Sequence, residues 1–357
     1  MSNIRSPKSE RCTKKKGCLY VLVSLTMFLM VRDASAQYVP IVSGGLVFTG
    51  STNKGSSNFQ PVVTPVVAAP LGEHFLAEGR FDFRGLVQET GTTGSYNAQF
   101  FSSIDYLQLD AIVAPKLTIT GGRFLIPFGT YNERLTPEWI RKFQDVPIIF
   151  PIGTRTSGSA NGAMVRGALF SSPDVQINYV GYFSAHSGVT KFEAGRSAGF
   201  RAEAYFPKQR VEAGTSYSRF LEGQHYNSVG VHLWWEPQRI PLQIRSEYAH
   251  GQHSQGYWIE AAYRLSQISG AHSWLAGMEP LFRMQQSFRS SPNTGVQSDG
   301  LPPVDTQQAD FGLLYTFPHE VRLSGSYSRQ FSSNGNGNIW DFALSYRFLF
   351  PMWRGHS

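Results

Sequence analysis

Cysteine is nearly absent from this chain. Only Cys12 and Cys18 occur among its 357 residues, and both lie within the first 36. If that segment is removed, the remaining chain has no disulfide framework, no thiolate nucleophile and no cysteine metal site. Enzyme signatures are missing as well, because the sequence contains no G-x-S-x-G elbow, no H-E-x-x-H pair, no Walker loop and no dinucleotide fingerprint. We therefore predict no catalytic residue, no cofactor and no metal site, and we expect the protein not to be an enzyme.

Long apolar runs are equally scarce, and the clear example lies near the N-terminus. Gly17–Val31 follows a basic stretch and precedes Ala34-Ser35-Ala36, the small-x-small pattern that signal peptidase accepts. The run has fifteen residues. A membrane-spanning helix needs roughly twenty, so a cleaved signal is favoured over a transmembrane anchor. We predict a signal peptide over residues 1–36, cleaved between Ala36 and Gln37.

Net charge gives no reason to expect a nucleic-acid partner. The whole chain carries +7, but the predicted signal alone holds seven Lys and Arg residues against two acids. Its removal leaves 25 bases and 23 acids, a net charge of +2. The basic character therefore belongs mostly to the export signal.

The sequence is rich in alternating apolar and polar residues over stretches of about ten positions. In the last stretch one face is apolar or aromatic, with Trp340, Phe342, Leu344, Tyr346, Phe348 and Phe350. The other face holds Asp341, Ala343, Ser345 and Arg347. Successive side chains of a strand point to opposite faces, so one face of this strand is apolar and suits lipid, and the other is polar and suits water. The same pattern recurs, with weaker strands between, over 74–88, 198–206, 228–235, 242–248, 257–265 and 308–317.

Strand length favours a membrane barrel over a soluble β-sandwich or lipocalin-like barrel. Strands of soluble proteins average about five to six residues, whereas runs of ten to thirteen recur here. A ten-residue strand rises about 33 Å and, when tilted by about 40°, covers the roughly 25 Å apolar band of an outer-membrane barrel. Because only helices and closed barrels satisfy every backbone hydrogen bond in lipid, the sheet must close.

Connections alternate between short proline turns and longer polar loops, as in transmembrane barrels. The turns include 114–116, 172–174, 207–209, 236–238 and 318–320. Counting backward from Phe350 to Glu73 gives fourteen strands over a barrel of residues 73–350, followed by a tail of residues 351–357. Residues 37–72 form an N-terminal segment that we interpret as a first hairpin, although Pro61, Pro65 and Pro70 argue against it. The predicted fold is an all-β transmembrane antiparallel up-and-down barrel with 14 to 16 strands, of which 16 is favoured.

Two segments resemble known outer-membrane proteins. GRFLIPFGTYNE, residues 122–133, resembles the G-x-x-x-x-PFG segment of the phosphate-selective porin O/P family. In that family the segment ends a strand and leads into a constriction loop, and the resemblance implies the same here. The final strand WDFALSYRFLF resembles the aromatic-terminated strand that the barrel assembly machinery recognises, but here a tail follows it.

The segment between residues 127 and 161 is the longest predicted connection, and we expect it to fold into the lumen and narrow the pore. A short helix is predicted from Thr136, with Pro137 at its first position. Its apolar edge, Trp139, Ile140 and Phe143, must be buried against the inner wall. The loop bases are expected to pair with wall acids such as Glu203 or Glu260 and to give the narrowest point a mild anion preference. The predicted constriction-loop bases are Arg134, Arg141, Lys142 and Arg155.

The predicted wet face of the strands gives the candidate pore lining. It carries nine bases and nine acids. An anion ladder needs a clear positive excess, so this balance favours a weakly selective or small-solute pore. The candidate pore-lining residues are Arg80, Arg84, Arg123, Arg166, Arg201, Glu203, Arg245, Glu260, Arg264, Asp310 and Arg347.

We therefore expect an outer-membrane porin-type channel for passive diffusion of small hydrophilic solutes or ions. Its expected partners are outer-membrane lipid, small hydrophilic or anionic solutes and the barrel assembly machinery. For the oligomeric state, the sequence is compatible with both a monomer and a homotrimer. Two rival hypotheses remain. One is an adhesin or scaffold with a closed lumen, which the long outer loops allow. The other is an outer-membrane lipid hydrolase.

Overall fold

The computed structural model describes residues 39–53, 56–90, 94–150, 157–223, 225–268, 274–290 and 301–351. The predicted cleavage site at Ala36 and Gln37, the predicted loop base Arg155 and residues 352–357 of the tail lie outside these ranges. Among the described residues, no helix is long and apolar enough to cross a membrane.

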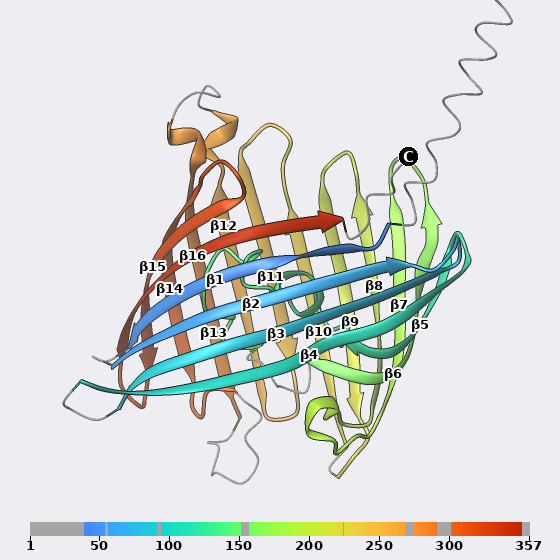
Figure 1. Cartoon of the computed structure of the whole chain (residues 1–357), viewed down its shortest axis with the longest axis horizontal. Helices are drawn as coiled ribbons and strands as arrows, with labels where there is room; N and C mark the ends of the chain where they lie inside the picture. The colour runs from blue at the N-terminus through green and yellow to red at the C-terminus, as the bar shows by residue number, and fades with distance from the viewer. Residues whose placement is uncertain are drawn as a thin grey trace, which may run out of the picture.

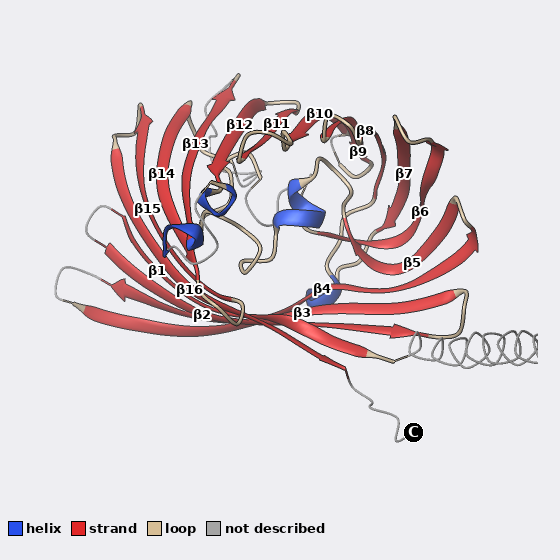
Figure 2. Cartoon of the chain, turned by 90° about the horizontal axis from the view of Figure 1, so that it is seen from above, coloured by secondary structure: helices blue, strands red, loops and turns tan. Residues whose placement is uncertain are grey.

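Sixteen antiparallel strands close into one barrel, in which β1 pairs with both β2 and β16 (Figures 1 and 2). Every other strand pairs with its neighbours in the chain, so the predicted up-and-down barrel is confirmed with the favoured count of sixteen. The strands are β1 Ile41–Asn53, β2 Ser56–Pro70, β3 Phe75–Thr90, β4 Ser95–Ala114, β5 Leu117–Leu125, β6 Ser159–Ser171, β7 Gln176–Ala185, β8 Ser197–Phe206, β9 Val211–Phe220, β10 Tyr226–Trp235, β11 Leu242–His250, β12 Ser254–Tyr263, β13 Met278–Arg289, β14 Thr306–Thr316, β15 Val321–Ser332 and β16 Gly337–Pro351.

The first hairpin forms despite its prolines. β2 pairs with β1 in unbroken register from Ser56 to Ala68. Its pairing with β3 runs through Val62 and Val63 but passes over Pro61 and Pro65. A proline has no N–H to donate, so the ladder is interrupted locally on one side and the strand itself continues.

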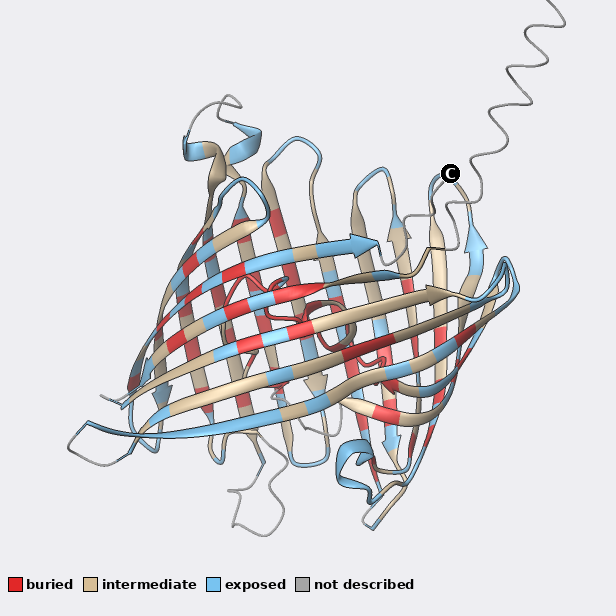
Figure 3. Ribbon diagram, viewed as in Figure 1, coloured by how far each residue is buried: buried red, intermediate tan, exposed pale blue. Residues whose placement is uncertain are grey.

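Side chains alternate across the wall as the sequence predicts. On β16, Phe342 and Leu344 point outward and are exposed, whereas Asp341, Ala343 and Ser345 point inward and are buried. Figure 3 shows the same alternation along many other strands, and it is clear in β10 to β14. The exterior is apolar over most strands, which is the surface that a transmembrane barrel presents to lipid.

The two ends of the barrel differ. The connections from β4 to β5, from β6 to β7 and from β8 to β9 are tight turns, and β1 begins and β16 ends on that same side. We call it the turn end. The opposite loop end carries most of the longer connections, including the one that joins β5 to β6. The long connection from β12 to β13 is an exception at the turn end. This agrees with the alternation predicted from the proline turns.

Candidate channel interior

The connection from β5 to β6 is hereafter the inner loop, and its described residues 126–150 and 157–158 lie inside the barrel (Figure 2). Its described part contains several of the most buried apolar side chains in the protein. Phe128, Phe150 and Phe143 are at most 2% exposed. Phe128, Tyr131, Leu135, Ile149 and Phe150 form one cluster with residues of the wall. The apolar core of this protein is therefore built where the inner loop meets the wall.

The PFG segment explains how the chain enters the lumen. Phe128 inserts between Phe150 and the wall, where a Cβ added to Gly230 would lie only 2.9 Å from its ring. Gly129 has φ +61°, a conformation that side chains disfavour, and an added Cβ would lie 2.6 Å from a Glu247 oxygen. The Gly129 N–H donates to Ser216 Oγ at 3.0 Å. Only glycine allows this sharp turn so close to the wall.

A buried carboxylate fixes the next turn of the inner loop. Glu247 of β11 accepts hydrogen bonds from the backbone N–H of Thr130 at 2.5 Å and of Tyr131 at 2.8 Å. It also accepts one from the Thr130 hydroxyl at 2.5 Å. These bonds hold a five-residue π-turn, η2 Tyr131–Leu135, against the wall. Unpaired N–H groups at the start of a helical turn are natural partners for an anion.

The predicted helix starting at Thr136 does not form. The helical turn lies earlier, at η2, and is followed only by a single turn in which Ile140 N–H donates to Pro137 O at 3.0 Å. The Thr136 hydroxyl donates backward to Asn132 O. It is therefore engaged with the preceding turn and does not cap a following helix.

Two of the three predicted apolar residues anchor the inner loop. Trp139 packs with Val47, Val62 and Ala343, and lies over Gly45. Phe143 packs against a second apolar patch, and Ile140 stays 42% exposed. The patch beneath Phe143 consists of Ala262, Leu281 and Leu314.

Ion pairs connect the inner loop to the wall. Arg134 donates to Glu212 of β9 at 2.6 Å and to Glu203 of β8 at 3.3 Å, as expected for Glu203. Lys142 pairs with Glu279. Burial lowers the pKa of Lys142 to about 8, although the charge of Glu279 opposes this effect.

The remaining charges in the described part of the loop are also paired. Arg141 pairs with Glu138 of the loop itself at 2.9 Å. Asp145 pairs with Arg283 of β13 at 2.5 Å, and burial raises the pKa of that carboxyl. Glu260, the other expected partner of a loop base, instead pairs with Arg245 of the wall at 3.6 Å.

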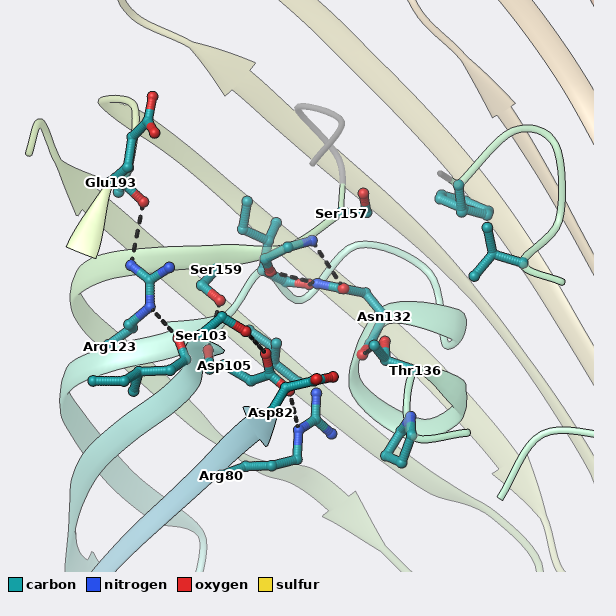
Figure 4. Close-up of a pocket in the computed structure, with 18 of the residues that line it drawn as sticks. Arg80, Asp82, Ser103, Asp105, Arg123, Asn132, Thr136, Ser157, Ser159 and Glu193 are labelled. Atoms are coloured by element: carbon teal, nitrogen blue, oxygen red, sulfur yellow. Dashed lines mark hydrogen bonds and ion pairs between the residues drawn. The ribbon is translucent and has the colours of Figure 1, made fainter. Parts of the chain in front are cut away.

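A cavity of about 680 Å³ lies between the inner loop, the wall formed by β2 to β5 and the connection from β7 to β8. Both apolar and charged residues line it, and we call it the polar cavity for the charges on its wall. Figure 4 shows its wall side, with Arg80, Asp82, Ser103, Asp105 and Arg123 pointing into it. The described loop residues on the other side include Asn132, Thr136, Pro137 and Glu138.

Charges around this cavity are mostly paired. Arg80 bonds to Asp105 at 2.8 Å, and Arg84 bridges Asp82 at 3.0 Å and Glu138 at 2.7 Å. Arg123 is held instead by the carbonyl oxygens of Ile104 at 2.7 Å and of Glu193 at 3.2 Å. Within the described ranges it has no carboxylate partner.

The predicted pore-lining residues fall into distinct groups. Arg80, Arg84 and Arg123 line the large cavity. Arg347 lines a smaller cavity of about 170 Å³ at the turn end. Arg166 pairs with Asp110, and Arg264 pairs with Glu236 at 3.4 Å; both arginines are about one-third exposed. The residues buried under the inner loop or within the wall network are Arg201, Glu203, Arg245, Glu260 and Asp310.

Two wall charges of this interior were not singled out from the sequence. Asp105 is an extra residue in β4, at a bulge where Arg80 pairs with Tyr106 and Phe81 pairs with Ile104. A bulge shifts the alternation by one position, so no simple period predicts that Asp105 faces inward. Arg283 lies on a strand whose inner face also carries Leu281 beneath Phe143, which weakens the alternating pattern there.

Comparisons with known proteins bear on the fold. The chain matches no protein-family model and no curated protein. Among solved structures, Salmonella typhi OmpF in complex with daunomycin covers 87% of this chain and 98% of its own, with 12% identity and a TM-score of 0.58. This chain has the porin fold. A loop-deletion mutant of OmpT, an outer membrane protein of Vibrio cholerae, has 10% identity, covers 87% of this chain and 100% of its own, and gives a TM-score of 0.54.

The anion-selective porin from Comamonas acidovorans also matches, with 10% identity, 87% of this chain and 98% of its own covered, and a TM-score of 0.53. The porin part of the sequence resemblance is thus confirmed at the level of the fold. None of the three matched structures is described as phosphate-selective.

Proposed function

We propose that the chain is a porin-type channel of the bacterial outer membrane, through which small hydrophilic solutes and ions diffuse passively. The observation that carries this proposal is the polar cavity between the inner loop and the wall of β2 to β5. The inner loop is fixed to other parts of the wall by Arg134 and Lys142. Beside the cavity it is held by Trp139 and by the ion pair of Glu138 with Arg84 of β3. Solutes are therefore directed to the side that the loop leaves open, and the inner loop acts as the constriction.

The charges of the cavity support weak ion selectivity. Arg80 and Arg84 are neutralised by nearby carboxylates, and Arg123 is the arginine of this cavity without a carboxylate partner in the described ranges. A ladder for phosphate would require a clear excess of positive charge. The cavity lining carries three arginines against the four acids Asp82, Asp105, Glu138 and Glu193. This balance favours weak selectivity among small solutes and ions, rather than a preference for phosphate.

A cysteine-free mature chain allows a direct test of this path. Ser103→Cys places a thiol in the cavity, and Leu344→Cys places one on the lipid-facing exterior. After insertion into a planar bilayer, a charged water-soluble thiosulfonate reagent is expected to lower the conductance of Ser103→Cys and to leave Leu344→Cys unchanged. If the Ser103→Cys channel conducts and the reagent does not change its conductance, the path of the solutes does not pass Ser103.

The rival adhesin or scaffold makes a different prediction in the same experiment. A closed lumen gives no conductance for the folded wild-type barrel, whatever the reagent does. Export by the signal peptide, contact with lipid and the barrel assembly machinery, and assembly as a homotrimer stay predictions from the sequence.

A further inference from the structure

Three potential metal ligands meet on the inner wall near the turn end. Glu203 of β8, Glu212 of β9 and His232 of β10 each offer one atom, and these atoms all lie within 4.8 Å of one another. The sheet register explains their proximity. Glu203 and His232 both pair with Gly214 on the strand between them, and Glu212 lies two residues from Gly214 on the same face.

Gly214 leaves room for the imidazole. A Cβ at this position would lie 2.4 Å from His232 Cε1 and 2.7 Å from its Nε2. The ring therefore lies directly over a backbone that carries no side chain, and it is directed toward the two carboxylates.

His232 has no hydrogen-bond partner for either ring nitrogen within the described part of the chain. Its side chain is completely buried, and Nε2 lies 3.7 Å from Glu212 Oε1. Buried polar groups are nearly always satisfied because desolvation without a partner is costly. An imidazole nitrogen beside two carboxylates is a ligand set that suits a divalent transition metal, which nitrogen and oxygen ligands bind at about 2.0–2.2 Å.

The neighbouring charges show what such an ion would displace. Arg134 of the inner loop donates to both carboxylates, and Arg201 lies 3.1 Å from Glu203. Asn178 donates to Glu203 at 3.4 Å, and Glu133 pairs with Arg201. Of these groups, Arg134 is the cation that bridges Glu203 and Glu212.

We propose that Glu203, Glu212 and His232 form a site for a divalent transition-metal ion of the Zn²⁺ class, in competition with the Arg134 guanidinium. Contraction of the ligands around the ion requires movements of less than about 1 Å for each. With three protein ligands, a fourth position stays open for water. Binding would release the Arg134 end of the inner loop from the wall. This inference does not rest on conduction, because metal binding is measured on the folded barrel alone.

Calorimetric titration of Zn²⁺ into the folded barrel in detergent tests the proposal, and Co²⁺ absorption spectra report the coordination. His232→Ala and Glu212→Gln are each expected to weaken Zn²⁺ binding by at least about tenfold, since even outer-shell losses cost 10–100-fold. Arg134→Met should tighten binding several-fold, because it removes the competing cation. His186→Ala is the matched control, since it removes an exposed histidine that is 3.0 Å from Glu222.

A heat-dependent shift in gel mobility shows that each variant barrel is folded. If His232→Ala does not fold, Glu212→Gln alone tests the metal site. Equal Zn²⁺ affinity in wild type and Glu212→Gln would overturn the site and indicate adventitious surface binding. Loss of binding in His186→Ala alone would do the same. Binding that Arg134→Met leaves unchanged would overturn the competition with the inner loop.

Discussion

Neighbouring side chains of one strand face different surroundings in this barrel. Leu344 is 49% exposed on the outer surface, and Ser345, the next residue, is 8% exposed on the inner one. The outward residue meets lipid and the inward residue meets a polar interior. The same substitution should therefore have unequal consequences at these two positions.

Leu344→Arg should destabilise the folded barrel by about 2–4 kcal/mol, because a charge at the bilayer midplane is costly. Ser345→Arg lies beside a small cavity with Glu320 and should be tolerated. Urea titration of folding into lipid vesicles, followed by gel shift, measures both. Equal destabilisation at the two positions would contradict the assigned faces.

Lys142 should make ion selectivity depend on pH. Burial lowers the pKa of its ammonium group to about 8, with Glu279 opposing that shift. The group is charged below this pH and neutral above it, so the pair with Glu279 gains one net negative charge as pH rises. We expect the reversal potential in a salt gradient to move toward cation preference between about pH 7 and 9. Lys142→Met should show no such step, and a wild type that titrates like this variant would refute the assignment.

The inner loop is positioned by glycines in the wall as much as by its own residues. Apolar side chains of the loop lie where a wall Cβ would collide with them, namely Trp139 at Gly45, Phe128 at Gly230, Ile149 at Gly256 and Phe143 at Gly312. Each of these glycines thus leaves a space on the inner face of its strand, and one loop side chain fills that space. This complementarity joins the loop to β1, β10, β12 and β14.

Gly45→Val should detach the Trp139 end of the inner loop. The added side chain takes the space of the indole, whose nearest ring atom lies 2.6 Å from the ideal Cβ. The lost burial of a large aromatic is about 2–3 kcal/mol. Single-channel recordings should show a noisier and larger conductance.

Gly121→Val is the matched control, because a Cβ there meets no atom within 4 Å. Both variants place the same β-favouring side chain in a strand. If the two recordings are indistinguishable from each other, Trp139 does not hold the inner loop.

A strand can be predicted from the sequence wherever one of its faces meets lipid and the other meets water, because apolar and polar residues then alternate. β16 shows this clearly, since its exposed apolar or aromatic residues Phe342, Leu344 and Tyr346 alternate with the buried Asp341, Ala343 and Ser345. The pattern weakens where the inner loop packs. Leu281 and Leu314 point inward because Phe143 lies on them. The sequence pattern of a strand does not reveal an apolar partner that lies far away in the chain, as Phe143 does from Leu281 and Leu314.

The sequence predicts which charged side chains face the interior of the barrel. It does not predict which of them remain exposed to solvent there. Asp310 faces inward as expected, yet it is fully buried because Arg283 bonds to it at 2.7 Å. Arg80, Arg84 and Arg123 line the cavity that the inner loop leaves beside β2 to β5, although Arg80 is only 3% exposed. Which inward charges meet solute depends on the path of the loop, and that path is set by tertiary contacts.

At the scale of the whole molecule, the barrel is a closed wall with an off-centre partition. The partition is fixed by ion pairs to β3, β8, β9 and β13 and by Trp139 at β1, β2 and β16. The open side is the polar cavity. If the protein is a channel narrowed by the inner loop, the folded barrel must conduct and the partition must limit its conductance.

Replacing Thr136–Pro147 with a short glycine–serine linker tests this requirement most directly. The change removes Trp139, Lys142 and Phe143 but leaves the sixteen strands and the PFG turn in place. In single-channel recordings, we predict that the wild type conducts and that the shortened loop gives a larger conductance with altered ion preference. A folded wild type that does not conduct, or a shortened loop with unchanged conductance and ion preference, would contradict the account.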